Sequence, residues 1–291
     1  MLDCTNYLKF WMSEKIGNKT DVQETIRIAT NIGVTSVLLD SYEVDGEYLS
    51  ALGDAGFQTV YFEDMLNTDC LADVVVNGLI GAETLKYKSP HVLLGTNYLV
   101  LGSEYWNISA KPRENTGLDQ IIITTGGIDH YDLTTRSINL LNRLDQPIHI
   151  HTVIGRYFDN AHEIEAAASK SRQKITLYHQ PDGIADIIRN CQFAISAGGL
   201  TLYELAAFGV ATVGVWLWEN QRENVERLGH EGAILPLAYN DQDKFDEQLF
   251  NAIEHLFLND QLRRNMARKG KKLVDGGGAR RVANALMDLT K

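Results

Sequence analysis

Cysteine, long apolar runs and net positive charge are scarce or absent in this sequence, and each absence excludes a class of protein. The three cysteines, Cys4, Cys70 and Cys191, lie far apart in 291 residues, which argues against a disulfide framework or a cysteine zinc site. A reducing compartment follows from this. No apolar run approaches the roughly 18 residues of a membrane span, and the polar N-terminal residues are unlike a signal peptide. We therefore expect a cytoplasmic protein with no membrane span.

The net charge of −11 gives no electrostatic help in binding a nucleic-acid backbone, so no nucleic-acid partner is expected. A small anionic ligand is still allowed, because helix N-termini and loop amides can hold phosphate without net positive charge. The eight histidines form no metal spacing such as HExxH, and most are expected to be structural. His149 and His151 share one face of a predicted strand. We expect neither a metal nor a cofactor.

Short β-branched apolar runs, bounded by turn residues, alternate with stretches of helical periodicity. Such continuous runs are typical of strands that are covered on both faces in a parallel sheet. The runs are 36–39, 59–62, 73–76, 121–125, 148–154, 175–177, 193–195 and 212–217. The helical stretches are 21–32 (with Asp21 as N-cap), 134–144, 184–189 and 200–208. This alternation predicts an α/β fold with parallel sheets.

A polar segment with a proline, residues 111–118, interrupts the alternation and predicts a boundary between two Rossmann-like lobes. The first lobe, residues 1–112, is short, and the second, residues 113–291, is complete. The tail at 259–291 is predicted to be helical, basic in patches and split by the segment DGGG at 275–278. A solvated helix face explains these charges better than a binding surface does.

The most informative segment is FAISAGGLTLYE, at 193–204. A strand is followed by Gly198 and Gly199 and then by a helix, so that backbone amides can approach an anion closely. Thr201 can add a hydroxyl, and Glu204 can accept hydrogen bonds from a ribose diol. A tight turn without a ligand explains the glycines equally well.

Gly126 and Gly127 end another strand, and Asp129 follows them either as a ligand or as a helix-entry aspartate. Two glycine loops at strand ends favour one crevice, although neither matches GxGxxG or a P-loop. Asn220 and Gln221 are predicted to lie at a third strand end, where they can contact sugar hydroxyls or a diphosphate. Glu219 and Asn220 can instead cap the next helix. Tyr42 ends a strand in the first lobe, either as a proton donor or as a rim aromatic.

Eight short motifs then follow one another along the chain: LLDSY (38–42), ED (63–64), ADVVVN (72–77), LLGTNYLVLGSEY (93–105), TTGGID (124–129), SAGGLTLYE (196–204), ENQ (219–221) and DGGGARRV (275–282). In this order they resemble the pseudaminic-acid-pathway hydrolases, which release UDP from a UDP-linked 2,4-diacetamido-trideoxy-altropyranose. That family is similar to the two-lobed GT-B glycosyltransferases and, in its UDP lobe, to MurG.

The resemblance implies that six residues hold UDP between the lobes and that Asn220 reaches the diphosphate or sugar. It also implies that Tyr42 lines the catalytic pocket. The six are Gly126, Gly127, Gly198, Gly199, Thr201 and Glu204.

The family's opening GxGH loop, with the histidine thought to activate water, has no counterpart here. The first lobe is therefore expected to be incomplete and to begin at its third strand, near 7–12. An exposed sheet edge would favour a homodimer. A UDP-sugar hydrolase in nonulosonic acid or surface-polysaccharide synthesis is the first hypothesis. A GT-B glycosyltransferase and a catalytically inactive nucleotide-sugar-binding relative are the alternatives.

Overall fold

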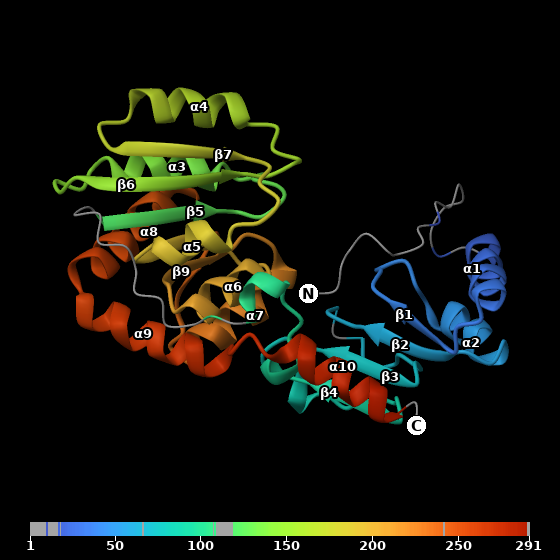
Figure 1. Ribbon diagram of the computed structural model, residues 1–291. Coiled ribbons are helices and arrows are strands. Elements are labelled where there is room, and N and C mark those ends of the chain that lie inside the picture. The colour runs from blue at the N-terminus through green and yellow to red at the C-terminus, as the bar shows by residue number, and fades with distance from the viewer. Residues whose placement is uncertain are drawn as a thin grey trace. The chain divides into compact units, whose positions relative to one another are not determined.

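The computed structural model describes residues 10, 17, 19–65, 67–106, 108, 119–240 and 242–289 (Figure 1). By their contacts these residues form two compact units. Unit 1 comprises the described part of Met1–Gly78 and Ala82–Leu94, and unit 2 comprises that of Leu79–Gly81 and Gly95–Lys291. The boundary predicted at 111–118 lies outside the described residues.

Unit 1 is a four-stranded parallel sheet with the order β1-β2-β3-β4. Leu39, Tyr61, Val75 and Val92 stand in one row across it. The first three of these side chains are buried or nearly so in one apolar cluster with residues of two helices. The elements of the unit are α1 (Lys19–Ile32), β1 (Ser36–Leu39), α2 (Gly46–Asp54), β2 (Gln58–Phe62), β3 (Val74–Asn77), η2 (Ala82–Thr84) and β4 (His91–Leu94).

The start of α1 differs from the prediction. The helix begins at Lys19, so Asp21 lies in its first turn and is not the N-cap. Asp21 is buried, and its carboxylate accepts a hydrogen bond of 2.8 Å from the amide of Gly17. Asp21 therefore stabilises the turn that leads into α1, although it lies inside the helix. The strand predicted at 7–12 lies outside the described residues apart from Phe10.

Unit 2 is built on a six-stranded parallel sheet with the order β10-β9-β8-β5-β6-β7. Its strands confirm every run that was predicted for the second lobe, with ends shifted by one or two residues. They are β5 (Asp119–Thr124), β6 (Ile148–Ile154), β7 (Lys174–His179), β8 (Phe193–Ala197), β9 (Ala211–Trp216) and β10 (Ile234–Ala238).

Helices cover both faces of this sheet, as the apolar strands require (Figure 1). Alternate residues of β5 divide between the two cores: Ile121 and Ile123 pack with α3, α4 and α8, and Ile122 packs with α5, α6 and α7. The helices are α3 (Leu133–Leu141), α4 (Ala161–Lys170), α5 (Ala185–Asn190), α6 (Thr201–Phe208), α7 (Glu219–His230), α8 (Gln242–Leu258), α9 (Asp260–Leu273) and α10 (Gly278–Leu289). The short turns η3 (Thr96–Tyr98) and η4 (Ser103–Tyr105) precede β5.

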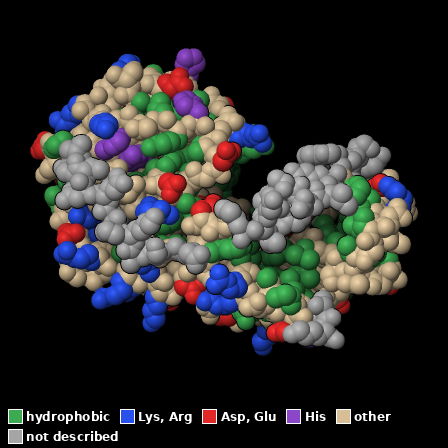
Figure 2. Space-filling view, viewed as in Figure 1, with side chains coloured by type: hydrophobic (Ala, Val, Ile, Leu, Met, Phe, Trp, Pro, Cys, Tyr) green, Lys and Arg blue, Asp and Glu red, His purple; other side chains and the backbone are tan. Residues whose placement is uncertain are grey.

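The predicted split of the C-terminal tail is confirmed between α9 and α10. Gly276 has a positive φ of 75°, and a Cβ at Gly278 would stand 1.9 Å from the carbonyl oxygen of Leu99. Glycine is therefore required where the chain passes so close to the backbone of another segment. The basic side chains of α9 are mostly exposed, and Figure 2 shows them along the surface of that helix. In the part of the chain that the structure describes, no helix is long and apolar enough to cross a bilayer.

Candidate functional site

The order of the strands in unit 2 creates a switch point between β5 and β8. The chain runs outward from β5 through β6 to β7, and then returns to place β8 on the other side of β5. In open α/β sheets a ligand crevice forms at such a point, outside the carboxyl ends of the strands. Gly126 and Gly127 follow β5, and Gly198 and Gly199 follow β8. The two predicted glycine loops are thus neighbours at this switch point.

The two glycines after β8 have different surroundings. A Cβ at Gly198 would stand 2.7 Å from Cγ2 of Val225 and 2.9 Å from Cβ of Gln221, so α7 packs directly on this residue. A Cβ at Gly199 would meet nothing within 4 Å. Gly198 is therefore required by packing, whereas Gly199 leaves its backbone open at the start of α6. The first amides of an α-helix lack acceptors within the helix and attract anions.

Hydrogen bonds that the sequence did not reveal hold this loop. The side-chain amide of Asn224 donates to the carbonyl oxygen of Gly198 at 2.8 Å. The hydroxyl of Tyr203 donates to Asn224 Oδ1, and it accepts a bond of 3.0 Å from the amide of Ile80. The glycine loop, α6 and α7 are thereby connected through buried or half-buried polar groups.

A cavity of ≈ 420 Å³ lies beside the glycine loops of unit 2. The ends of β5, β6 and β7 and the start of α6 form its walls, and Gly126, Gly127 and Thr201 are among the lining residues. The structure thus brings three of the predicted residues to one cavity. Gly198, Gly199 and Glu204 lie in the adjoining turn and helix and do not line it.

Other lining residues of this cavity were not predicted. Gly155 and Arg156 follow β6, and Gln180 and Asp182 follow β7. A Cβ at Gly155 would stand 2.3 Å from the carbonyl oxygen of Gly126, so the loops after β5 and β6 fit together only with glycine there. Gly155 directly follows the strand predicted at 148–154, but a single glycine after a strand does not by itself indicate a binding loop.

Glu204 lies in the first turn of α6, as predicted, and is half-buried. Burial raises the pKa of its carboxyl, and hydrogen bonds with Tyr105 and Thr201 oppose this shift. Burial, followed by the charge of Glu204, also raises the pKa of Tyr105, whose side chain is only 1% exposed. The three side chains form one polar group at the start of α6.

Asp129 is 1% exposed and caps α3. Its two carboxylate oxygens accept hydrogen bonds from the amides of Leu133 and Thr134, at 2.9 and 3.0 Å. The interpretation as a helix-entry aspartate is therefore confirmed. These two hydrogen bonds account for an aspartate at this position without any contact between Asp129 and a ligand.

Asn220 and Gln221 lie in the first turn of α7, whereas the sequence suggested a strand end. Capping by Glu219 or Asn220 is also wrong: the N-cap position belongs to Trp218, and no side-chain hydrogen bond caps the helix. Gln221 folds back, and its Oε1 accepts a bond of 3.0 Å from the amide of Leu217. This bond and the contact with Gly198 fix Gln221, and Asn220 is exposed.

Tyr42 belongs to unit 1, where it follows β1 at the carboxyl edge of the sheet. Its side chain is 72% exposed, and its hydroxyl donates a hydrogen bond of 3.0 Å to Asp64 Oδ2. Asp64 follows β2, the neighbouring strand. Tyr42 thus has an acidic partner, Asp64, which the sequence analysis named only as part of the ED motif.

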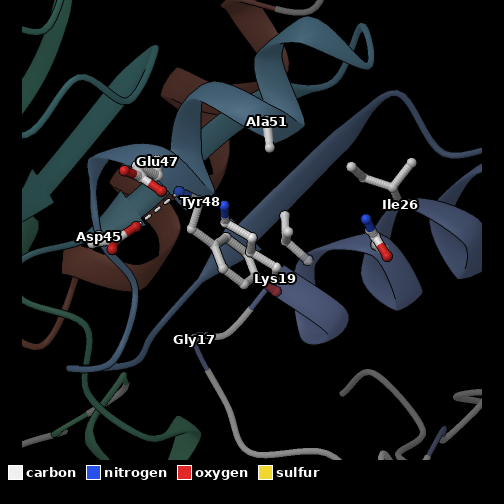
Figure 3. Close-up of a pocket in the computed structure, with 9 residues that line it drawn as sticks. Gly17, Lys19, Ile26, Asp45, Glu47, Tyr48 and Ala51 are labelled. Carbon is white, nitrogen blue, oxygen red and sulfur yellow. Dashed lines mark hydrogen bonds between the residues drawn. The ribbon is translucent and has the colours of Figure 1, made fainter.

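Unit 1 has a cavity of its own, of ≈ 280 Å³, between α1 and α2. Figure 3 shows Lys19, Asp45, Glu47 and Tyr48 around it. Asp45 is engaged as the N-cap of α2, with its carboxylate accepting a bond of 2.9 Å from the amide of Tyr48. None of the residues predicted for the site lines this cavity.

Two curated relatives align with about three quarters of the chain. The spore coat polysaccharide biosynthesis protein SpsG of Bacillus subtilis is 23% identical over 75% of this chain and 65% of its own length. The uncharacterized protein MJ1062 of Methanocaldococcus jannaschii is 24% identical over 72% of this chain and 45% of its own length. The chain therefore matches between about half and two thirds of the length of these relatives.

The fold recurs in solved structures of other proteins. MurG of Acinetobacter baumannii superposes with a TM-score of 0.66 and 19% identity, over 92% of this chain and 78% of that one. A structure of S. aureus MnaA with UDP gives a TM-score of 0.66 and 13% identity, over 96% and 81% of the two chains. The two units with parallel sheets are thus those of the GT-B fold. The family model described as the glycosyltransferase family 28 C-terminal domain matches residues 121–277, more than half of the 291 residues, and the chain therefore belongs to that family.

Proposed function

We propose that unit 2 binds the diphosphate of a UDP-sugar against the loops after β5 and β8. The observation that carries this proposal is the open backbone at Gly199 and at the start of α6, where Thr201 lines a cavity together with the loops after β5, β6 and β7. The helix dipole and the first-turn amides favour a negative group there. The UDP in the similar S. aureus structure supports the choice of nucleotide.

The reaction that we propose is hydrolysis of the bond between the anomeric carbon and the nucleotide. Unit 2 stabilises the departing UDP through backbone amides, which act at the place where charge develops. Tyr42 takes part in the reaction at the sugar. The motif order that resembles the pseudaminic-acid-pathway hydrolases supports this assignment, and the sugar would then be a UDP-linked diacetamido-trideoxyhexose.

Transfer of the sugar to an acceptor is the second candidate, because the family model and the GT-B fold are those of glycosyltransferases. Incubation of the purified chain with UDP-sugars in the absence of an acceptor distinguishes hydrolysis from transfer. A hydrolase releases UDP and free sugar in equal amounts over many turnovers, as chromatography and NMR would show. A transferase releases UDP in this way only when an acceptor is added.

Binding without catalysis is the third possibility, and stability measurements separate it from the others. UDP at a hundredfold excess over its Kd would raise the free energy of unfolding by about 2.7 kcal/mol, and turnover would be absent. If calorimetry shows no heat with UDP or any other nucleoside diphosphate, the proposal for unit 2 is wrong.

Substitution of the two glycines after β8 separates packing from binding. Gly198→Ala is expected to lower the free energy of unfolding by about 1–3 kcal/mol, because the new methyl group must displace α7. Gly199→Ala is expected to change it by less than about 0.5 kcal/mol, because its methyl group enters open space. The same methyl group is expected to weaken UDP binding by about tenfold or more, since it keeps the diphosphate from the backbone.

Urea unfolding and calorimetry with UDP measure the two effects on both variants. Gly33→Ala serves as the control for a methyl group that meets nothing within 4 Å but lies far from these loops in sequence. Because Gly33 has a φ of +72°, that control is expected to lose some stability and to keep its response to UDP. Unchanged UDP affinity in Gly199→Ala would contradict the placement of the diphosphate.

A further inference from the structure

The carboxyl edge of the unit 1 sheet carries a hydrogen-bonded pair, Tyr42 and Asp64. The two residues follow adjacent parallel strands, β1 and β2, and the phenol donates to Asp64 Oδ2 at 3.0 Å. Both side chains are exposed, so a ligand can reach them. A hydrogen bond from a phenol fixes one oxygen of a carboxylate and leaves lone pairs on both oxygens for a further donor.

Few of the described side chains of unit 1 can take up a proton at this edge. The one histidine among residues 1–94, His91, is the first residue of β4 and therefore lies at the opposite, amino edge of the sheet. Glu63 is 3% exposed, and its oxygens already accept four hydrogen bonds. Among the described residues at this edge, exposed carboxyls such as those of Asp40, Glu43 and Asp64 remain, and Asp64 is the one that accepts a hydrogen bond from Tyr42.

The surroundings of Asp64 also suit a proton acceptor. Burial raises the pKa of its carboxyl, the hydrogen bond from Tyr42 lowers it, and the carboxylates of Glu63 and Asp40 raise it again. Tyr61 is the other titratable group close by, and its hydroxyl donates to the carbonyl oxygen of Ser41. A carboxylate with a raised pKa is a stronger base than an ordinary aspartate, which increases its efficiency in general-base catalysis.

We propose that Asp64 accepts the proton of the hydroxyl group that attacks the sugar, and that Tyr42 is the positioning residue that orients this carboxylate. The inference rests on the proposed function. In the step, the O–H bond of water breaks and its proton passes to Asp64, while the water oxygen bonds to the anomeric carbon. The bond from that carbon to the β-phosphate oxygen breaks, and its electron pair stays on UDP. Asp64 then returns the proton to solvent.

The first test compares Asp64→Asn with wild type and with Asp69→Asn in the full chain. The probes are UDP-N-acetylglucosamine and a UDP-linked 2,4-diacetamido-2,4,6-trideoxyhexose. Asp64→Asn is expected to lower kcat by about 100-fold or more, with KM and the Kd for UDP within about threefold of wild type. Asp69 lies in the same β2–β3 connection and is paired at the surface with Lys88, so Asp69→Asn is expected to keep wild-type kcat.

The pH profile provides a readout that a merely structural role would not move. The acid limb of kcat/KM for wild type reports protonation of Asp64 in the free enzyme. Tyr42→Phe removes the side-chain hydrogen bond that lowers the pKa of Asp64, so the limb is expected to shift to higher pH, while Asp64→Asn is expected to abolish it. Tyr42→Phe also keeps the test decisive if Asp64→Asn does not fold.

The outcomes separate this inference from the function on which it rests. If wild type binds UDP and releases it from a probe but Asp64→Asn keeps more than a tenth of kcat, Asp64 is not the proton acceptor. An acid limb that stays in place in Tyr42→Phe overturns the positioning role. If wild type releases UDP from neither probe, the hydrolase function falls, and this inference falls with it.

Discussion

Replacing Glu63 by alanine is expected to lower the free energy of unfolding of unit 1 by about 3–5 kcal/mol. The Glu63 side chain is buried, and its Oε1 accepts bonds from the amides of Met65 and Asn67, at 2.7 and 2.9 Å. Its Oε2 accepts from the side chains of Asn77 and Tyr87, at 3.2 and 2.5 Å. Alanine would leave four donors without this acceptor, and two of them belong to the buried Asn77 and the half-buried Tyr87.

The large effect follows from where these donors lie. Asn77 ends β3, Tyr87 lies in the segment before β4, and the two amides lie in the connection that follows β2. One carboxylate therefore ties three parts of a small sheet together. Its loss is expected to affect this whole edge of unit 1 and not a single turn.

Hydrogen exchange measured by mass spectrometry tests this prediction, because it reports each unit separately. Protection of β2 and β3 is expected to fall in Glu63→Ala, while that of β5 and β8 in unit 2 serves as the internal control. Tyr87→Phe removes one of the four donors and is expected to cost only about 1–2 kcal/mol. A loss below about 1 kcal/mol in Glu63→Ala would show that water replaces the carboxylate without difficulty.

The sequence predicted every inner strand of the two sheets, together with the outermost strands β1 and β7. β3 and β8 are buried along their whole length, and each gives an unbroken apolar run. The apolar runs did not include β4 and β10, which are outermost in their sheets. Val92 is exposed in β4, and Pro236 interrupts β10, where an edge position tolerates a residue without an amide hydrogen. Both strands that were missed are thus edge strands, although the edge strands β1 and β7 were found from their apolar runs.

The candidate site was predictable where its signal is local. A strand, two glycines and a helix follow one another within a dozen residues, and both glycine loops were found in this way. The cavity walls after β6 and β7 were not found, because only the order of the strands brings Arg156 and Gln180 to the same place as Gly126. The bond from Asn224 to Gly198 likewise joins residues 26 positions apart.

The positions of polar residues along the sequence also could not show which side chains form hydrogen bonds within the protein. Asp129 and Gln221 were predicted as ligands because polar residues near strand ends often are. In the structure, the carboxylate of Asp129 accepts hydrogen bonds from the first amides of α3, and Oε1 of Gln221 accepts one from the amide of Leu217, which follows β9. Each side chain thus pairs with a backbone amide that would otherwise lack an acceptor. Backbone groups at strand and helix ends compete with ligands for such residues, and that competition depends on the fold.

Acidification is expected to destabilise unit 2 through His151. Its side chain is 7% exposed and stands between two neutral partners, with Nδ1 2.9 Å from the hydroxyl of Tyr178 and Nε2 2.8 Å from Oε1 of Gln120. Burial, followed by the charges of His149 and Lys174, lowers the pKa of His151 to about 4. The folded protein therefore keeps this imidazole neutral.

The direction of the pH effect follows from proton binding in the two states. In the unfolded chain His151 has an ordinary pKa of about 6.5, so between about pH 4 and 6.5 the unfolded state binds more protons than the folded one. Stability contributed by the neutral histidine is complete above this window and is lost as the pH falls through it. The shift corresponds to a loss of up to about 3 kcal/mol.

Urea unfolding of wild type and His151→Gln, followed at pH 4.5, 5.5, 6.5 and 7.5 by the fluorescence of the unit 2 tryptophans, measures this loss. Glutamine stays neutral at each pH and can bond to Tyr178, so its stability is expected to fall much less between pH 6.5 and 4.5. His149→Gln is the matched control: His149 is half-buried, its ring lies 4.1 Å from that of His151, and burial lowers its pKa as well. Its removal is expected to flatten the curve only partly, because the buried imidazole of His151 remains. Equal pH slopes in wild type and His151→Gln would mean that His151 takes up its proton without disrupting the sheet.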